Sequence, residues 1–257
     1  MVLSLSPPAS PLRAALKAPV PLTTAALAGA IGVMGLIGWA LDIESLKRIV
    51  PTLVAMNPTT ATCFILIALV LPAWSFERED LARRLMRIVG VIVGLIKLFD
   101  LIVGTDASID RYIFAEKLKG PGTLNTNAMA PNTALNLLLM GVAWLVIPSS
   151  NRRLIAAAQT CAALTMVLAG IAVIGYLYGA FGFYQARAYF PMALHTAITF
   201  MIVVIGVLWH HPDQGLMATL TAKDLGGSTA RLLLPSVTGI PLVLGIPLAC
   251  GHQERRG

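Results

Sequence analysis

The feature that most constrains this chain is a series of long apolar blocks separated by short segments that hold most of the charged residues. About 20 apolar residues in an α-helix cross the hydrocarbon core of a bilayer. The blocks therefore predict an all-α fold, a polytopic membrane bundle of about seven transmembrane helices. The predicted spans are residues 20–41, 52–74, 88–104, 129–147, 154–180, 190–209 and 231–250.

The composition agrees with a membrane-embedded chain and excludes several classes of function. Only 12% of the residues are charged, against about 25% in a typical soluble domain. No Walker lysine, GxSxG, HExxH or CxxC motif occurs, so the sequence predicts a protein that is not an enzyme and indicates neither a metal nor a cofactor. We expect a tail at residues 1–19, a transmembrane domain at 20–250 and a second tail at 251–257.

The net charge of +7 predicts an orientation in the membrane. Lysine and arginine are enriched in cytoplasmic loops. A cytoplasmic N-terminus places ten basic residues on the inner side and eight on the outer side. We therefore expect a multi-pass protein of the bacterial cytoplasmic (inner) membrane with its N-terminus inside. The expected partners are the lipid bilayer and either a second copy of the chain or a cytoplasmic signalling protein, and not nucleic acid.

Three of the predicted spans begin alike, with a proline, a threonine–alanine pair and then an apolar run. The three openings read Asn57-Pro58-Thr59-Thr60-Ala61, Pro131-Asn132-Thr133-Ala134 and Pro191-Met192-Ala193-Leu194-His195-Thr196-Ala197. The threonine–alanine pairs are 73 and 63 residues apart, which is about one helical hairpin with its loops. Proline suits the first turn of a helix, where its missing N–H group is no loss. The pattern predicts an internal helical-hairpin repeat.

With the N-terminus inside, all three of these spans enter the membrane from the outer face, and their polar residues should meet. Polar side chains inside a membrane normally face the bundle and hydrogen-bond across helices. The predicted cluster either holds the helices together or forms a small ligand pocket open to the outer face. Its members are Thr60, Asn132, Thr133, Asn136, His195, Thr196 and Thr199.

Two other patterns concern packing and charge inside the membrane. Lys97 and Asp100 are three residues apart in the third span, close enough to form an ion pair on one helix face. They are interpreted either as a structural pair or as part of a proton or ion relay. The first span repeats glycine every third residue, which predicts a close approach by another helix. These glycines are Gly29, Gly32, Gly35 and Gly38.

The chain resembles the N-terminal multi-span region of certain bacterial sensor proteins, in which this region precedes PAS, histidine kinase or GGDEF output domains. The resemblance covers roughly residues 50–245 and rests on the repeated openings at 56–61, 130–136 and 191–197, with Gly175-Tyr-Leu-Tyr-Gly179 and Pro212-Asp-Gln-Gly-Leu-Met217. It implies a membrane-embedded sensory input module that passes an unidentified stimulus to a cytoplasmic output domain.

The chain departs from this family after the seventh span, because the sequence ends at Gly257 without an output domain. We expect a module that lacks its output domain, such as a truncated or frameshifted product. Two other functions remain open at the level of sequence. One is a small-solute or ion transporter or channel, which the repeat and the intramembrane polar residues would suit. The other is a structural partner subunit.

Overall fold

The computed structural model describes residues 19–50, 53–70, 81–103, 113–114, 117, 128–177, 192–222 and 227–229. Every regular element in these ranges is a helix, so the all-α prediction is confirmed. The helices are α2 (Pro19–Leu41), α3 (Glu44–Lys47), α4 (Pro58–Val70), α5 (Leu81–Val103), α7 (Pro131–Val146), α8 (Arg152–Leu177), α10 (Leu194–Leu208) and α11 (Gly215–Thr221).

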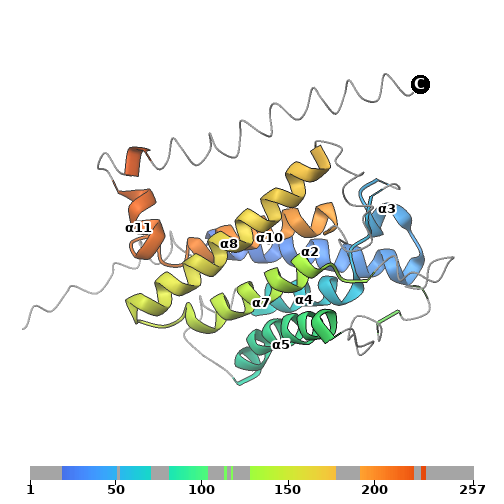
Figure 1. The fold of residues 1–257 in the computed structure, drawn as a ribbon, viewed down its shortest axis with the longest axis horizontal. Coiled ribbons are helices and arrows are strands. Elements are labelled where there is room, and N and C mark those ends of the chain that lie inside the picture. The colour runs from blue at the N-terminus through green and yellow to red at the C-terminus, as the bar shows by residue number, and fades with distance from the viewer. Residues whose placement is uncertain are drawn as a thin grey trace, which may run out of the picture.

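The six long helices close into a ring. Each packs against the next along the chain, in the order α2, α4, α5, α7, α8 and α10, and α10 packs back against α2. Helices α7 and α10 also touch across the ring. The short helices α3 and α11 lie at opposite ends of the bundle (Figure 1). The chain runs in the same direction through α4, α7 and α10, and all three helices begin at the end that carries α3 (Figure 1).

Six of the seven predicted spans overlap a helix, and the seventh, residues 231–250, lies outside the described residues. Within the described residues only two helices, at Val20–Leu41 and Arg152–Leu177, are long and apolar enough to cross a membrane. Three other apolar helices, at Pro58–Leu69, Pro131–Val146 and Leu194–Leu208, are shorter. The seven-span bundle is therefore not confirmed.

The shorter lengths have a physical reason. The prediction counted residues 53–57, 129–130 and 192–193, which precede α4, α7 and α10, as helix, although the chain is not helical there. Sixteen helical residues span only about 24 Å, less than a hydrocarbon core of about 30 Å. Helix α5 is instead longer than predicted, because it begins at Leu81 and not at residue 88. It carries five charged residues and is not among the two candidate spans.

Glycines bring the helices of the ring into close contact. A β-carbon on Gly32 would lie 2.7 Å from the carbonyl oxygen of Ala61 in α4, and one on Gly38 would lie 2.8 Å from the backbone nitrogen of Lys47. The close approach predicted from the glycine repeat is thus confirmed. The contact between α5 and α7 is of the same kind, because a β-carbon on Gly94 would lie 2.7 Å from the backbone nitrogen of Leu138.

Buried polar groups join the helices at the end of the bundle that carries α11. The side-chain amide of Gln159 in α8 donates to the carbonyl of His211 (3.1 Å) and accepts from the backbone N–H of Met217 (3.4 Å). A ring nitrogen of His211 lies 3.0 Å from the carbonyl oxygen of Ile147. These bonds fasten α11 to α8, against which it packs.

Candidate functional site

The three repeated openings adopt the same structure. In each, the first backbone hydrogen bond of the helix runs from the alanine of the threonine–alanine pair to the residue before the helix. These bonds join Ala61 to Asn57, Ala134 to Ala130 and Ala197 to Ala193, each at 3.0 Å. The sequence repeat is therefore also a repeat in backbone structure.

Burial follows the same register. The third helical residue is a threonine with 1%, 3% and 2% of its surface exposed in α4, α7 and α10. The seventh helical residue is apolar and fully buried in all three helices, at Phe64, Leu137 and Phe200. The rings of Phe64 and Phe200 meet edge to face, with centroids 5.0 Å apart. Each opening thus turns the same face towards the interior of the bundle.

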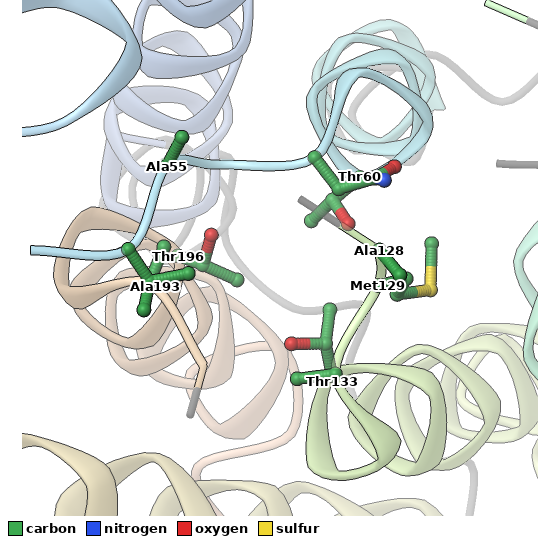
Figure 2. Close-up of a pocket in the computed structure, with 10 residues that line it drawn as sticks. Ala55, Thr60, Ala128, Met129, Thr133, Ala193 and Thr196 are labelled. Carbon is green, nitrogen blue, oxygen red and sulfur yellow. The ribbon is translucent and has the colours of Figure 1, made fainter. Parts of the chain in front are cut away.

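A small cavity lies where the three helix starts converge. Thr60, Thr133 and Thr196 project into it from three different helices (Figure 2). Its volume is about 10 Å³, at the lower limit for one water molecule. Its other described lining residues are Val54, Ala55, Asn57, Ala128, Met129, Ala130 and Ala193.

Several buried polar atoms at this end of the bundle have no hydrogen-bond partner within the described residues. They include the Thr60 hydroxyl, both amide atoms of Asn136 and both ring nitrogens of His195. A buried polar group without a partner costs about 1–3 kcal/mol. In native proteins such groups are satisfied by an ordered water, by a bound molecule or ion, or by a further side chain.

The predicted cluster is only partly assembled around the cavity. Asn132 is half-buried and its side chain accepts from the backbone N–H of Thr133 at 3.0 Å. Asn136 lies one turn deeper than Thr133, on the same face of α7. The hydroxyl of Thr199 donates to the carbonyl of His195 at 2.6 Å. Asn136 and Thr199 are buried and Asn132 is half-buried, and none of the three lines the cavity.

The prolines of the repeat are described in two of the three openings. Pro58 and Pro131 are the first residues of α4 and α7, as predicted. Pro191 lies outside the described residues, and α10 begins at Leu194 with Ala193 as its N-cap. The start of α10 is held by Tyr176 in α8, whose hydroxyl donates to the carbonyl of Met192 at 2.7 Å.

The loop that forms one wall of the cavity is anchored to the corner between α2 and α3. The indole N–H of Trp39 donates to the carbonyl of Met56 at 2.7 Å. The backbone N–H of Met56 donates to the carbonyl of Lys47 at 2.9 Å. Lys117 closes the end of α2 by donating to the carbonyls of Trp39 and Ala40, where a cation also offsets the helix dipole.

Charged side chains hold this corner together. The Asp42 carboxylate lies 2.8 Å from the Lys117 ammonium and 3.0 Å from that of Lys47, and Lys47 also pairs with Glu44 at 2.9 Å. Hydrogen bonds from Lys117 and then Lys47 lower the pKa of Asp42, and the bond from Lys47 lowers the pKa of Glu44. Both carboxylates are therefore held in the charged form.

Lys97 and Asp100 form the predicted ion pair on α5, with the ammonium nitrogen 3.7 Å from a carboxylate oxygen. Their side chains are 14% and 6% exposed, so both charges turn into the bundle. Cys63 is buried and Cys161 is half-buried. In the part of the chain that the structure describes, no group of three or more His, Cys, Asp or Glu residues could hold a metal ion.

The sequence interpretation missed the residues that shape the site without carrying its chemistry. The loop residues Val54 and Ala55 line the cavity, and so do Ala130 and Ala193. The sequence held a signal for Ala130 and Ala193, since each of these two alanines lies three residues before a threonine of the repeat. Lys117 was missed because it is far from α2 in the sequence.

Comparison with known proteins gives no relative for this site: no protein-family model, curated protein or solved structure matches the chain. The function is therefore argued from the site and the surface of the bundle.

Proposed function

We propose that this chain is a membrane-embedded sensory input module of a bacterial signal-transduction protein of the sensor histidine kinase type. In this proposal the bundle crosses the inner membrane several times, the convergent helix starts receive the stimulus, and the opposite end passes it to a cytoplasmic output domain. The resemblance to the multi-span region of bacterial sensors supports this assignment of roles.

The surface of the bundle supports membrane insertion through more than the two longest helices. Helix α5 exposes an apolar stripe at a spacing of three to four residues, while its charged residues Lys97 and Asp100 turn inwards. The stripe consists of Ile88, Ile92, Leu95, Phe99 and Ile102, which are 37–83% exposed. Helix α8 exposes Leu164, Val167 and Ile171 in the same way. Soluble monomers rarely expose apolar patches of this extent, whereas lipid would cover them.

The observation that carries the proposal is the convergence of three equivalent helix starts on one small cavity. The cavity as it stands holds about one water molecule, so a larger occupant requires the starts of α4, α7 and α10 to separate. These helices alternate with the others in the closed ring, and a displacement of one helix start therefore changes the packing of its neighbours. A stimulus acts only through a difference in affinity between two such packings.

The test asks whether the cavity is coupled to the far end of the bundle. Spin labels are placed on Ile88→Cys in α5 and Leu216→Cys in α11, two exposed positions, after alanine replaces Cys63, Cys161 and Cys250. The distribution of distances between the two labels is measured by double electron–electron resonance spectroscopy in lipid vesicles. It is compared with and without Thr196→Met, which overfills the cavity. We expect Thr196→Met to shift the distribution.

Two controls separate coupling from general damage. Ile198→Met changes an exposed residue of the same helix and should leave the distribution unchanged. A label pair within α8, on Arg153→Cys and Ile171→Cys, should report the same distance in every variant. An unchanged distance between α5 and α11 in both Thr196→Met and Thr133→Met, with helicity preserved by circular dichroism, would refute the sensing proposal.

The ion pair of Lys97 and Asp100 favours a second candidate function, the transport of a small solute or ion, because charges inside a membrane commonly mark a conduction path. Flux into vesicles loaded with a pH- or ion-sensitive dye distinguishes the two functions. Transport predicts a flux that Asp100→Asn abolishes. A sensor predicts that wild-type vesicles are no more permeable than protein-free vesicles.

A further inference from the structure

We infer that the cavity between the starts of α4, α7 and α10 binds a single small anion of halide size. The role of the anion as the stimulus rests on the proposed function. Binding of the anion to the cavity does not. The inference rests on the sign of the electrostatic potential, on one unpaired hydroxyl and on the size of the cavity.

The sign follows from the direction of the helices. The N-terminus of a helix carries roughly half a positive charge, and its first N–H groups have no partner inside the helix. Three helices of 13, 16 and 15 residues begin at this cavity. None of its ten described lining residues is charged, so none of them supplies a carboxylate that would neutralise this potential. A cation is disfavoured for the same reason.

The Thr60 side chain supplies an independent reason to expect an occupant. It is 1% exposed, its hydroxyl has no hydrogen-bond partner within the described residues, and it points into the cavity (Figure 2). A hydroxyl can donate to an anion, and Thr133 and Thr196 present two more hydroxyls to the same space. In α10 no side chain caps the helix, so its first turn offers backbone donors as well.

The size of the cavity limits which anions fit. A volume of about 10 Å³ holds about one water-sized particle. Chloride has roughly twice the volume of a water molecule, so it needs a small separation of the helix starts, whereas sulfate, phosphate and organic carboxylates need a larger one. The cavity therefore favours a monovalent halide over polyatomic anions.

Thermal unfolding of the purified chain in detergent tests the inference. Sodium gluconate is replaced stepwise by sodium chloride or sodium bromide at constant ionic strength. A ligand that binds only the folded state raises its stability in proportion to the logarithm of the ligand concentration above Kd. We expect the unfolding temperature to rise with the logarithm of the concentration of either halide, not to rise with sulfate, and to respond in the same way with potassium salts.

Matched threonine variants test whether the halide binds at the cavity. Thr60→Val should raise the apparent Kd for bromide at least tenfold, and Thr60→Ser, which keeps the hydroxyl, should restore binding. Thr62→Val is the control, because the Thr62 hydroxyl is already bonded to the carbonyl of Pro58 at 3.0 Å. If Thr60→Val does not fold, Thr196→Val replaces it.

The outcomes are distinct from those of the coupling experiment, which is carried out in gluconate. An unfolding temperature that is independent of halide, or a halide effect that is equal in Thr60→Val and the wild type, would overturn the inference and assign the cavity to a trapped water. Coupling between the cavity and α11 without halide binding would support the sensing proposal with a different ligand. Halide binding without coupling would support the anion site and refute the sensing proposal.

Discussion

At the scale of single residues, Asp42 shows how a polar corner is held at the end of an apolar bundle. Its pKa is lowered from 3.8 by Lys117 and Lys47. A carboxylate whose pKa is lowered by folding stabilises the folded state above its ordinary pKa, and this contribution is lost as the pH falls through the lowered value.

We therefore expect the unfolding temperature to fall as the pH decreases below about 4, and to fall less in Asp42→Asn than in the wild type. Thermal unfolding in detergent at a series of pH values measures this difference. The side chain of Asp42 is 60% exposed, so the effect should be small and should decrease at high salt. Identical pH profiles at low salt would contradict the assignment.

Gln159 is the second residue whose role the structure reveals. It is fully buried and joins α8 to His211 and to Met217 in α11. In Gln159→Leu the buried groups lose their partner, at a local cost of about 1–3 kcal/mol. We expect hydrogen exchange of the α11 amides to become roughly tenfold faster, since 1.4 kcal/mol is a factor of ten.

The neighbouring Thr160→Val provides the control for this measurement. Thr160 is exposed, and its hydroxyl bonds to the carbonyl of Ala156 in its own helix at 2.9 Å. Exchange in α11 should not change in this variant. Equal exchange rates in Gln159→Leu and the wild type would show that α11 is held by its apolar contacts, chiefly Met217.

Residue contacts of this kind were the least predictable from sequence. Lys97 and Asp100 could be paired because their spacing alone brings them to one helix face. Gln159 appeared only as a polar residue in an apolar block, and its partner is 52 residues away. Lys117 caps a helix 77 residues before it, and no local pattern specifies such a contact.

At the scale of elements, glycine determines how closely neighbouring helices pack. A β-carbon on Gly94 would lie 2.7–2.9 Å from atoms of Ala134 and Leu138 in α7, two of which belong to the backbone. Backbone atoms cannot move aside without displacing the helix, and overpacking typically costs about 1–3 kcal/mol. We expect Gly94→Ala to lower the unfolding temperature.

Gly170 in α8 is the matched control, because no atom lies within 4 Å of the position its β-carbon would occupy. Alanine is favoured over glycine inside a helix by about 1 kcal/mol. Gly170→Ala should therefore leave the unfolding temperature unchanged or raise it. A similar decrease in both variants would mean that loss of glycine, rather than the contact between α5 and α7, lowers stability.

Helix positions were largely predictable, because apolar runs and proline starts are local signals. The starts of α4 and α7 follow from Pro58 and Pro131, which occupy the first turn. The start of α10 at Leu194 has no such proline, and Ala193 takes the position of Asn57 and Ala130. The common feature of the three openings is the position of the threonine–alanine pair. The openings meet because the helices close into a ring, and no single opening encodes that arrangement.

At the scale of the whole molecule, the ring has two chemically different ends. The end with α3 carries the paired charges of Asp42, Glu44, Lys47 and Lys117, whereas the opposite end carries arginines in the first turns of α5 and α8. Lysine and arginine are enriched in cytoplasmic segments, and acidic residues contribute little to this bias. We therefore expect the end with α11 to be cytoplasmic and the cavity to lie near the outer face.

Cysteine labelling in intact bacterial cells tests this orientation. Asn151→Cys and Ile49→Cys are exposed positions at opposite ends of the bundle, introduced after alanine replaces Cys63, Cys161 and Cys250. A membrane-impermeant maleimide should label Ile49→Cys in intact cells and Asn151→Cys only in inverted vesicles. Labelling of both positions from the same side would mean that α8 and its neighbours do not cross the bilayer. A stimulus from outside could then not reach the cavity by the proposed route, because both ends of the ring would face one compartment.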